Sequence, residues 1–340
     1  MKSSLLAFMP YVLLIVLIGV SCRGISQDIL IFSENFLGGG STFTLNSGGP
    51  SSGSGINQWV VNNQYGGTGS CPATPDQSTA NTNGGTISGA PQSNYLHIQN
   101  TTAGSGNACF DQGAASDQFA IISSGFCTFG LEEVHISFFW IGEGNANAYG
   151  SLWYQADGGG WIQAGPNLNS SSIWQYEDIT LPEFSNVGSL QFGFRFMNDG
   201  SGTNGELSLG IDEINVVASL STLNPVNISI TSVSPNPVCE GTFLTVSYEI
   251  SEPLCDGTYL LELSDASGNY PSGFTSWAVN IAYPATTGST TILLPAGAAA
   301  ASCYTVRLSR ISPEPAVTGT ASACFEIIEC PNTITTAPLG

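Results

Sequence analysis

Large apolar residues recur at every second position through much of this chain, and this alternation decides which folds are open to it. It runs over residues 134–140 as Val, Ile, Phe and Trp, and over residues 190–196 as Leu and Phe. A period of two places apolar side chains on one face of a β-strand. No window holds a helical stripe of useful length, so the sequence predicts an all-β protein.

The spacing of these strand-like segments divides the chain into two folding units. Residues 27–219 hold enough of them to enclose one core, which predicts an N-terminal jelly-roll β-sandwich. Residues 227–330 hold about seven in roughly 100 residues, which is typical of an immunoglobulin-like (Ig-like) β-sandwich. We expect residues 220–226 to be a short linker that Pro225 stiffens. Residues 331–340 are expected to be a linker or tail.

Two long polar loops interrupt the first unit, at residues 38–55 and 66–89. Both are rich in Gly, Ser and Asn. Loops of this length are usually functional or mobile. The sequence leaves two alternatives open, namely binding loops at one end of the sandwich or flexible connections.

The first 26 residues are typical of a secretory signal peptide. After a short basic start, the apolar run over residues 5–20 is shorter than the roughly 20 residues that a membrane-spanning helix needs. Gly24 and Ser26 fit the small-residue cleavage pattern, which predicts cleavage after Ser26 and a secreted or cell-surface protein. A signal anchor and a lipoprotein cleaved before Cys22 are the alternatives. No other stretch is apolar enough to predict a transmembrane segment in the mature chain.

The charge of the chain excludes several classes of partner. The formal net charge is -20, and loss of the signal peptide would leave 25 acidic residues against three basic ones. Those three are Arg195, Arg307 and Arg310. Nucleic-acid binding needs clustered cations that neutralise phosphates, so the sequence excludes it. Anionic membranes and acidic polymers would be repelled.

Eight cysteines remain after the signal peptide, and in an exported chain they indicate a disulfide framework. Three lie in the first half and five in the second, so either one bridge joins the halves or each half keeps an odd thiol. We predict a bridge between Cys71 and Cys109, with Cys127 buried and unpaired. The remaining cysteines expected in bridges include Cys239, Cys255, Cys303 and Cys324. The cysteines form no CxxC pair, so the sequence does not favour a zinc site.

A series of short segments carries a family resemblance. In the first unit they are residues 32–36 (FSENF), 107–111 (NACFD), 115–119 (ASDQF), 194–199 (FRFMND) and 211–214 (IDEI). In this order they resemble the MAM-like or cleaved-adhesin-type jelly roll of secreted surface proteins in Bacteroidota. Residues 232–237 (SVSPNP) and 263–268 (LSDASG) resemble the Ig-like repeats of large adhesins in the same bacteria.

This resemblance implies export, often by the type IX secretion route, and a cell-surface or gliding-related role. The sequence departs from the family pattern at its end, where we see no C-terminal sorting domain. We expect either that more chain follows or that another partner retains the protein.

Four acids of the first unit predict a structural calcium site. Glu34 lies near the first strand and Asp212 near the last, and a jelly roll pairs its terminal strands. Asp117 and Glu213 are further candidate ligands, since Ca²⁺ takes six to eight oxygens. Similar jelly rolls often hold calcium at this position. The alternative is that these acids cap loops or pair with Arg195.

Arg195 is the only basic residue of the first unit after the signal peptide. Strand alternation places its side chain on the face opposite to Phe194 and Phe196. The simpler interpretation is an arginine that pairs with one of the many acids. The alternative is an anchor for a ligand carboxylate or a sugar hydroxyl.

An aromatic-rich region supplies candidate ligand-binding residues, namely Trp161, Trp174 and Tyr176, beside Trp153 and Tyr154. Exposed aromatic faces hold sugars in many carbohydrate-binding modules. Trp161 follows a glycine-rich turn and is the residue that we most expect to be exposed. The alternative for the group is ordinary core and hairpin packing, which we expect for Trp140.

The sequence favours binding over catalysis. It contains no nucleophile elbow, zinc-protease motif or phosphate-binding loop. His97 and His135 both lie in strand-like segments, where structural roles are commoner. We therefore predict a secreted or cell-surface adhesin, or a structural component that binds a protein partner or assembles at the bacterial surface. The alternative is a carbohydrate-binding module of a larger secreted protein or enzyme, with glycans as partners.

Overall fold

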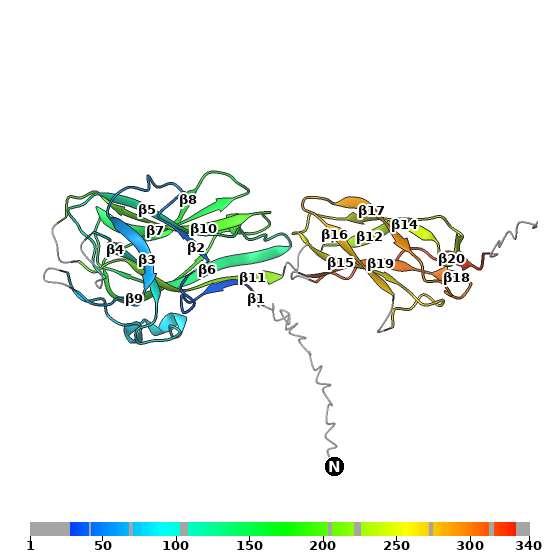
Figure 1. Cartoon of the computed structure of the whole chain (residues 1–340), viewed down its shortest axis with the longest axis horizontal. Helices are drawn as coiled ribbons and strands as arrows, with labels where there is room; N and C mark the ends of the chain where they lie inside the picture. The colour runs from blue at the N-terminus through cyan, green and yellow to red at the C-terminus, as the bar shows by residue number, and fades with distance from the viewer. Residues whose placement is uncertain are drawn as a thin grey trace, which may run out of the picture.

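The chain folds into two β-sandwiches that lie end to end along the long axis of the molecule (Figure 1). The computed structural model describes residues 28–40, 42–67, 71–102, 108–202, 206–220, 226–271, 275–312 and 316–330. The predicted signal peptide with Cys22, most of the predicted linker and the predicted tail lie outside these residues. In the described part, no helix is long and apolar enough to span a membrane. Its helical segments are the short 3₁₀ turns η1 (Gln77–Thr79), η2 (Thr82–Gly84) and η3 (Pro182–Phe184), so the all-β prediction is confirmed.

The first sandwich consists of two antiparallel sheets. The β11 sheet has the strand order β3-β4-β11-β6-β9, and β1 pairs with the same edge of β11 as β4 does. Its strands are β1 (Asp28–Glu34), β3 (Asn57–Asn62), β4 (Tyr95–Asn100), β6 (Leu131–Gly142), β9 (Ser171–Thr180) and β11 (Gly210–Leu220). The β10 sheet has the order β2-β5-β10-β7-β8. Its strands are β2 (Phe43–Leu45), β5 (Ser116–Ile122), β7 (Ala148–Ala156), β8 (Ile162–Leu168) and β10 (Leu190–Asn198).

The connectivity is that of a jelly roll. Strands β4-β11-β6-β9 face β5-β10-β7-β8, which is the order produced by two Greek keys over eight strands. The core between the sheets contains the predicted alternating residues of β6 and β10, and Ile136, Phe138, Phe192 and Phe194 are all fully buried. The period-two alternation therefore identified the inward faces of these strands.

The outer side of the β11 sheet is covered by the long loop between β3 and β4. Tyr65 and Ile87 of this loop pack on Phe139, Ile141 and Trp174 of the sheet in a second apolar cluster. The Trp174 carbonyl oxygen accepts a hydrogen bond from the Asn81 amide at 2.8 Å, and the Trp174 indole donates to the Pro75 carbonyl oxygen at 2.9 Å. The described part of this loop is thus attached to the sheet.

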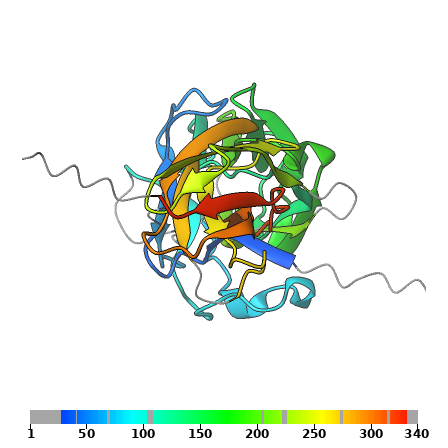
Figure 2. The same ribbon diagram turned by 90° about the vertical axis from the view of Figure 1, so that its right-hand side faces the viewer.

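The second sandwich has the Ig-like arrangement. One sheet has the order β12-β14-β17, and the other combines β13-β20-β18 with β16-β15-β19, because only Thr305 separates β18 from β19. The strands are β12 (Ile228–Ser234), β13 (Val238–Cys239), β14 (Phe243–Ile250), β15 (Gly257–Leu263), β16 (Ser276–Ile281), β17 (Thr287–Leu293), β18 (Ala301–Tyr304), β19 (Val306–Ser312) and β20 (Phe325–Ile328). Its core is a separate apolar cluster. Viewed from its end, this sandwich stands in front of the jelly roll (Figure 2).

Four disulfides connect the eight cysteines that follow the predicted signal peptide. Cys71–Cys109 confirms the predicted pair, and Cys239–Cys330 and Cys303–Cys324 lie inside the Ig-like domain. Cys127 pairs with Cys255 of the second domain, so the prediction of a buried, unpaired Cys127 is wrong. Cys127 is only partly buried at the end of the jelly roll that faces the Ig-like domain, where it meets Cys255. Such a framework fits an oxidising compartment.

Aromatic packing accompanies the bridge between the domains. The rings of Phe129 and Tyr283 stack with their centroids 5.2 Å apart. A groove of about 500 Å³ lies beside them, and its lining includes Leu30 and Phe126.

Candidate ligand-binding face

The outward side of the β10 sheet carries the polar and aromatic groups that we assign as the candidate site, and we call it the outer face. Ala120 and Ile122 of β5 point into the core, so Asp117, Phe119 and Ile121 point the other way. By the same alternation, Gly193, Arg195 and Met197 of β10 and Ser151 and Trp153 of β7 lie on the outer face.

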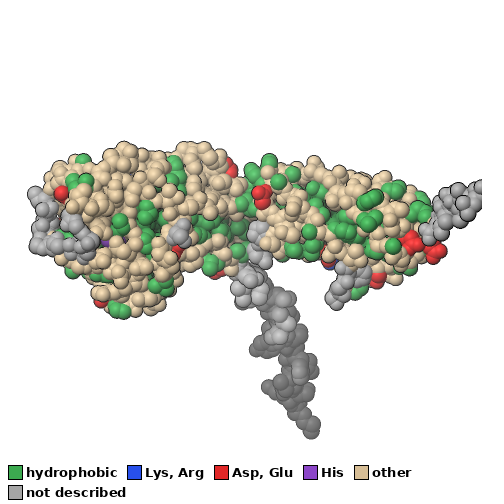
Figure 3. Space-filling model, viewed as in Figure 1, with side chains coloured by type: hydrophobic (Ala, Val, Ile, Leu, Met, Phe, Trp, Pro, Cys, Tyr) green, Lys and Arg blue, Asp and Glu red, His purple; other side chains and the backbone are tan. Residues whose placement is uncertain are grey.

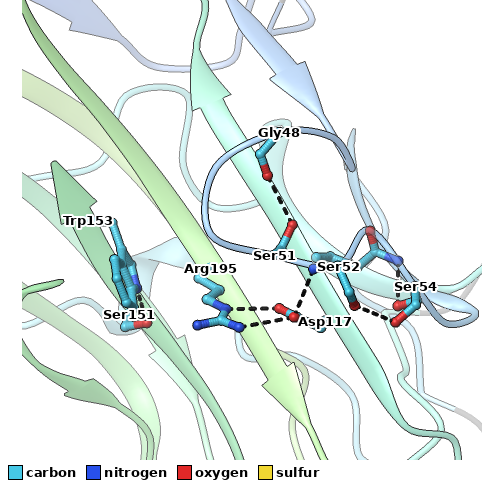
Figure 4. A network of polar contacts seen from close by, with 9 residues as sticks. Gly48, Ser51, Ser52, Ser54, Asp117, Ser151, Trp153 and Arg195 are labelled. Atoms are coloured by element: carbon cyan, nitrogen blue, oxygen red, sulfur yellow. Dashed lines mark hydrogen bonds and ion pairs between the residues drawn. The ribbon is translucent and has the colours of Figure 1, made fainter. Parts of the chain in front are cut away.

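Strand register brings these side chains together at the middle of the sheet. Arg195 lies opposite Phe119 on one side and Ser151 on the other. Gly193, two residues earlier, lies opposite Trp153. The arginine of the central strand can therefore reach both the acid of β5 and the indole of β7 (Figure 4).

Arg195 forms a two-point ion pair with Asp117. Its Nε lies 2.8 Å from Oδ1 of Asp117, and its Nη2 lies 3.0 Å from Oδ2. Burial alone would raise the pKa of Asp117, but the hydrogen bonds from Arg195 and from the Ser52 amide outweigh it and lower the pKa. The hydrogen bond to Asp117 raises the pKa of Arg195. The pair is charged on both sides at neutral pH, and the simpler prediction for Arg195, pairing with an acid, is confirmed.

The guanidinium also lies over an indole. The Cζ atom of Arg195 is 5.5 Å from the centroid of the Trp153 ring, within range of a cation–π contact. The Trp153 indole donates a hydrogen bond to the Ser151 hydroxyl at 2.8 Å, which fixes the plane of the ring. Both partners of this contact are partly exposed, so a ligand has access to them.

Phe119 lies buried beneath the outer face and supports it. A Cβ atom on Gly49 or on Gly193 would lie 2.3 Å from the Phe119 ring, so both positions require glycine. The Trp161 ring meets Phe119 edge-on with a centroid distance of 4.9 Å. Phe119 is fully buried, whereas Trp161 is partly exposed, as predicted. The loop that carries Gly49, one of the two long loops of the sequence, therefore borders the site.

Amide side chains surround this centre. Gln155 and Gln191 are partly exposed, and Gln163 and Asn167 of the edge strand β8 are exposed. The Gln163 amide donates to the Asn167 side-chain oxygen at 3.0 Å. Flat aromatic surface bordered by neutral hydrogen-bonding groups suits a ligand with both apolar faces and hydroxyls.

Two of the predicted aromatic ligand-binding residues lie elsewhere. Trp174 is fully buried beneath the loop on the β11 sheet, so its prediction as an exposed sugar platform is wrong. Tyr176 is a neighbour on β9, and Gly84 lies directly on its ring. Both residues hold the loop to the sheet. Trp140 is buried in the core, as expected.

Three of the four predicted calcium ligands come together. Asp212 is fully buried, and Glu34 and Glu213 lie close enough to contribute to raising its pKa. Burial is the largest cause, and the pKa of Asp212 rises to about 8. Asp117 lies on the other sheet with Arg195, so it is not part of this group, and its prediction as a ligand is wrong.

The oxygens of these three carboxylates already accept hydrogen bonds. Glu34 accepts from the Phe36 amide and the Thr42 hydroxyl, and Glu213 accepts from the amide and hydroxyl of Ser88. Asp212 accepts from the Gln77 side chain and the Glu213 amide. Among the described residues, no group of three or more His, Cys, Asp or Glu has a geometry that fits a metal ion. In this arrangement the acids fasten loops to the sheet, and calcium stays a prediction.

The histidines have structural surroundings. His97 is fully buried on the Tyr95 ring, and burial lowers its pKa to about 4. Its Nε2 lies 2.8 Å from the Asn62 side-chain oxygen. His135 pairs with Asp178, with 2.6 Å between Nδ1 and Oδ1.

Comparison with known proteins gives no family. No protein-family model matches the chain, and no curated protein matches it significantly. Among solved structures, it is similar to the glycoside hydrolase domain of Endo-D from Streptococcus pneumoniae R6, with 13% identity, a TM-score of 0.25, and coverage of 69% of this chain and 33% of that one. It is also similar to TmCBM27, a carbohydrate-binding module described for specific mannan recognition, with 10% identity, a TM-score of 0.28, and coverage of 57% and 99%.

A third similar structure is the β-glucuronidase of Parabacteroides merdae, with 10% identity, a TM-score of 0.21, and coverage of 63% of this chain and 28% of that one. The chain thus spans only about a third of the Endo-D domain. Similarity at these scores transfers no function. The fold and its cysteines define the class as a disulfide-bonded, two-domain β-sandwich protein.

Proposed function

We propose that this chain is an extracellular binding module that holds a carbohydrate on the outer face of its β10 sheet. The observation that supports this most directly is the group formed by Trp153, Arg195 and Asp117, in which a partly exposed indole lies next to a fixed ion pair. A pyranose ring presents C–H groups on one face and hydroxyls around its edge. The indoles of Trp153 and Trp161 would pack against the C–H face. Arg195, Asp117 and the surrounding amides would form hydrogen bonds with the hydroxyls.

The pKa and burial of Asp212 and Asp117 support a role in binding over one in acid–base catalysis. The carboxyl with the strongly raised pKa, Asp212, is fully buried and out of reach of a substrate. Asp117 is held as an anion by its arginine. Neither group has the exposed, shifted pKa that a general acid needs.

The predicted signal peptide, the disulfides and the resemblance to adhesins support a place outside the cell. Uncharged side chains dominate the visible surface (Figure 3). In this proposal the Ig-like domain holds the jelly roll away from the surface to which the protein is attached.

A glycan array with the full mature chain tests the proposal. We expect selective binding, and Trp153→Ala should weaken it by about 2 kcal/mol, or about thirtyfold in Kd, because an aromatic contact at the centre of a site is lost. Phe243→Ala is the control, since Phe243 is a 66% exposed aromatic residue of the Ig-like domain. No selective glycan, or equal losses in both variants, would contradict carbohydrate binding.

A protein partner is the second candidate function. Phe243 and Leu293 lie opposite each other on β14 and β17, and their side chains are 66% and 51% exposed. Adjacent exposed apolar side chains favour contact with another protein. If this function holds, a chain with Phe243→Ser and Leu293→Ser loses a partner that Trp153→Ala retains, which cross-linking on the intact cell surface would detect.

A further inference from the structure

Resting on the proposed function, we infer that the ligand of the outer face is an electrically neutral glycan, and that Arg195 and Asp117 bind its hydroxyls together as one neutral unit. A site with a free arginine would instead select uronic acids, sialic acids or sulfated sugars. Neutral and anionic glycans are thus two chemical classes of ligand, and the paired arginine favours the neutral class.

The charge of Arg195 is already neutralised. Both its Nε and its Nη2 donate to Asp117, in the two-point geometry that makes Arg–carboxylate pairs strong. An anionic ligand would have to compete with a carboxylate that is fixed in place at no further entropic cost. No other basic residue lies between Gln27 and Ser219, so the domain has no second cation to offer.

The electrostatic field of the whole molecule also disfavours an anionic ligand. The chain has a formal net charge of -20. An approaching anion is repelled once it comes within the screening length of about 8–10 Å, and the Arg195–Asp117 pair has no net charge to offset this. A neutral ligand meets no such barrier.

The pair still has hydrogen-bonding capacity for hydroxyls. No described residue accepts a hydrogen bond from Nη1 of Arg195, which lies on the side of the guanidinium away from Asp117 (Figure 4). An ionised carboxylate accepts at more positions than the three bonds from Arg195 and Ser52 occupy. A hydroxyl both donates and accepts, so neighbouring hydroxyls of a sugar ring can use Nη1 and Asp117 at once.

The geometry is set before any ligand arrives. The Ser52 amide donates to Oδ2 of Asp117 at 2.9 Å, and the Ser151 hydroxyl fixes the Trp153 indole. Preorganised groups lose little conformational entropy on binding, so uncharged hydrogen bonds to sugar hydroxyls have little ordering cost to offset.

A second Arg–carboxylate pair in the molecule supplies a matched control. In the Ig-like domain, Arg307 donates to Glu262 through Nε at 2.7 Å and Nη2 at 3.2 Å, and its Cζ lies 4.2 Å from the Tyr270 ring centroid. Glu262→Gln therefore removes the same kind of carboxylate from the same kind of group, outside the outer face.

The test compares neutral glycans with uronate-containing or sulfated glycans of the same linkage, on the full mature chain. We expect the unaltered protein to bind the neutral member about tenfold more tightly or better, with little change in Kd between about 0.05 and 0.5 M NaCl. Asp117→Asn leaves Arg195 unpaired. It should weaken neutral binding by about tenfold and bring in anionic glycans with an affinity that salt reduces. Glu262→Gln should change neither.

The outcomes separate the two proposals. Selective binding of anionic glycans by the unaltered chain overturns this inference and leaves carbohydrate binding in place. No glycan binding at all overturns both. If Asp117→Asn does not fold, as circular dichroism would reveal, Asp117→Asn combined with Arg195→Gln removes the charges together. That variant must lose neutral binding and gain no anionic binding, and retained neutral binding would contradict the role of the pair.

Discussion

At the scale of single residues, the charge of Asp117 is paired and that of Asp212 is suppressed by burial. Arg195 is paired with Asp117, and Asp212 is buried beside Glu34. The sequence indicated that Glu34 and Asp212 would approach, because terminal strands of a jelly roll pair. It could not show that Asp117 belongs to Arg195, since that contact depends on the register between β5 and β10, which alternation alone does not fix.

Asp212 should make stability depend on pH. Its folded pKa is about 8 against an ordinary 3.8, so between these values the folded state binds a proton that the unfolded state has released. Stability should therefore fall as pH rises from about 4 to 8. Asp212→Asn cannot titrate, so its Tm should lack this fall and exceed that of the unaltered protein at pH 8, by about 2–4 °C per kcal/mol.

The same melting curves test the calcium prediction. If Asp212 and Glu34 bind Ca²⁺, excess Ca²⁺ over EDTA should raise the Tm of the unaltered chain at pH 8 and leave Asp212→Asn unchanged. Glu240→Gln, which removes an acid of the Ig-like domain, should respond as the unaltered chain does. A Tm that is indifferent to Ca²⁺ would remove calcium from this site.

At the scale of elements, the strands were predictable and their outer coverings were not. Alternation identified β6 and β10 because one face of each strand lies in the core. Trp174 has the same local pattern as an exposed strand residue, yet the loop after β3 buries it. Which outer face a long polar loop covers depends on contacts between residues far apart in sequence, such as the 99 positions between Pro75 and Trp174.

Gly84 should hold this loop in place. A Cβ atom there would lie 1.9 Å from the Tyr176 ring, so Gly84→Ala must push the loop or the ring away. We expect a loss of about 1–3 kcal/mol in the free energy of unfolding, measured by urea denaturation. Gly160→Ala, where the added atom meets nothing within 4 Å, should change it by less than about 0.5 kcal/mol. Equal effects of the two substitutions would mean that the loop does not depend on this contact.

At the scale of the whole molecule, the disulfide Cys127–Cys255 bridges the two domains. Each domain has its own core, and the sequence correctly separated them. Its count of cysteines left open whether a bridge joined the halves. Whether such a bridge forms depends on how the ends of the two sandwiches face each other, which the sequence does not show. In the structure, Cys127 meets Cys255 beside the Phe129–Tyr283 stack, so a bridge joins the domains.

Removing this bridge should free the domains without unfolding them. In a chain with Cys127→Ser and Cys255→Ser, the Phe129–Tyr283 stack is left without a covalent bond beside it, and an aromatic pair contributes only about 0.5–1.5 kcal/mol beyond the area it buries. Small-angle X-ray scattering should then show a broader distribution of interatomic distances, while glycan binding stays unchanged because the outer face lies within one domain. Cys71→Ser with Cys109→Ser removes a bridge inside the jelly roll and should leave the distance distribution narrow. An unaltered distribution in the first variant would show that packing at the junction, and not the disulfide, sets the angle between the domains.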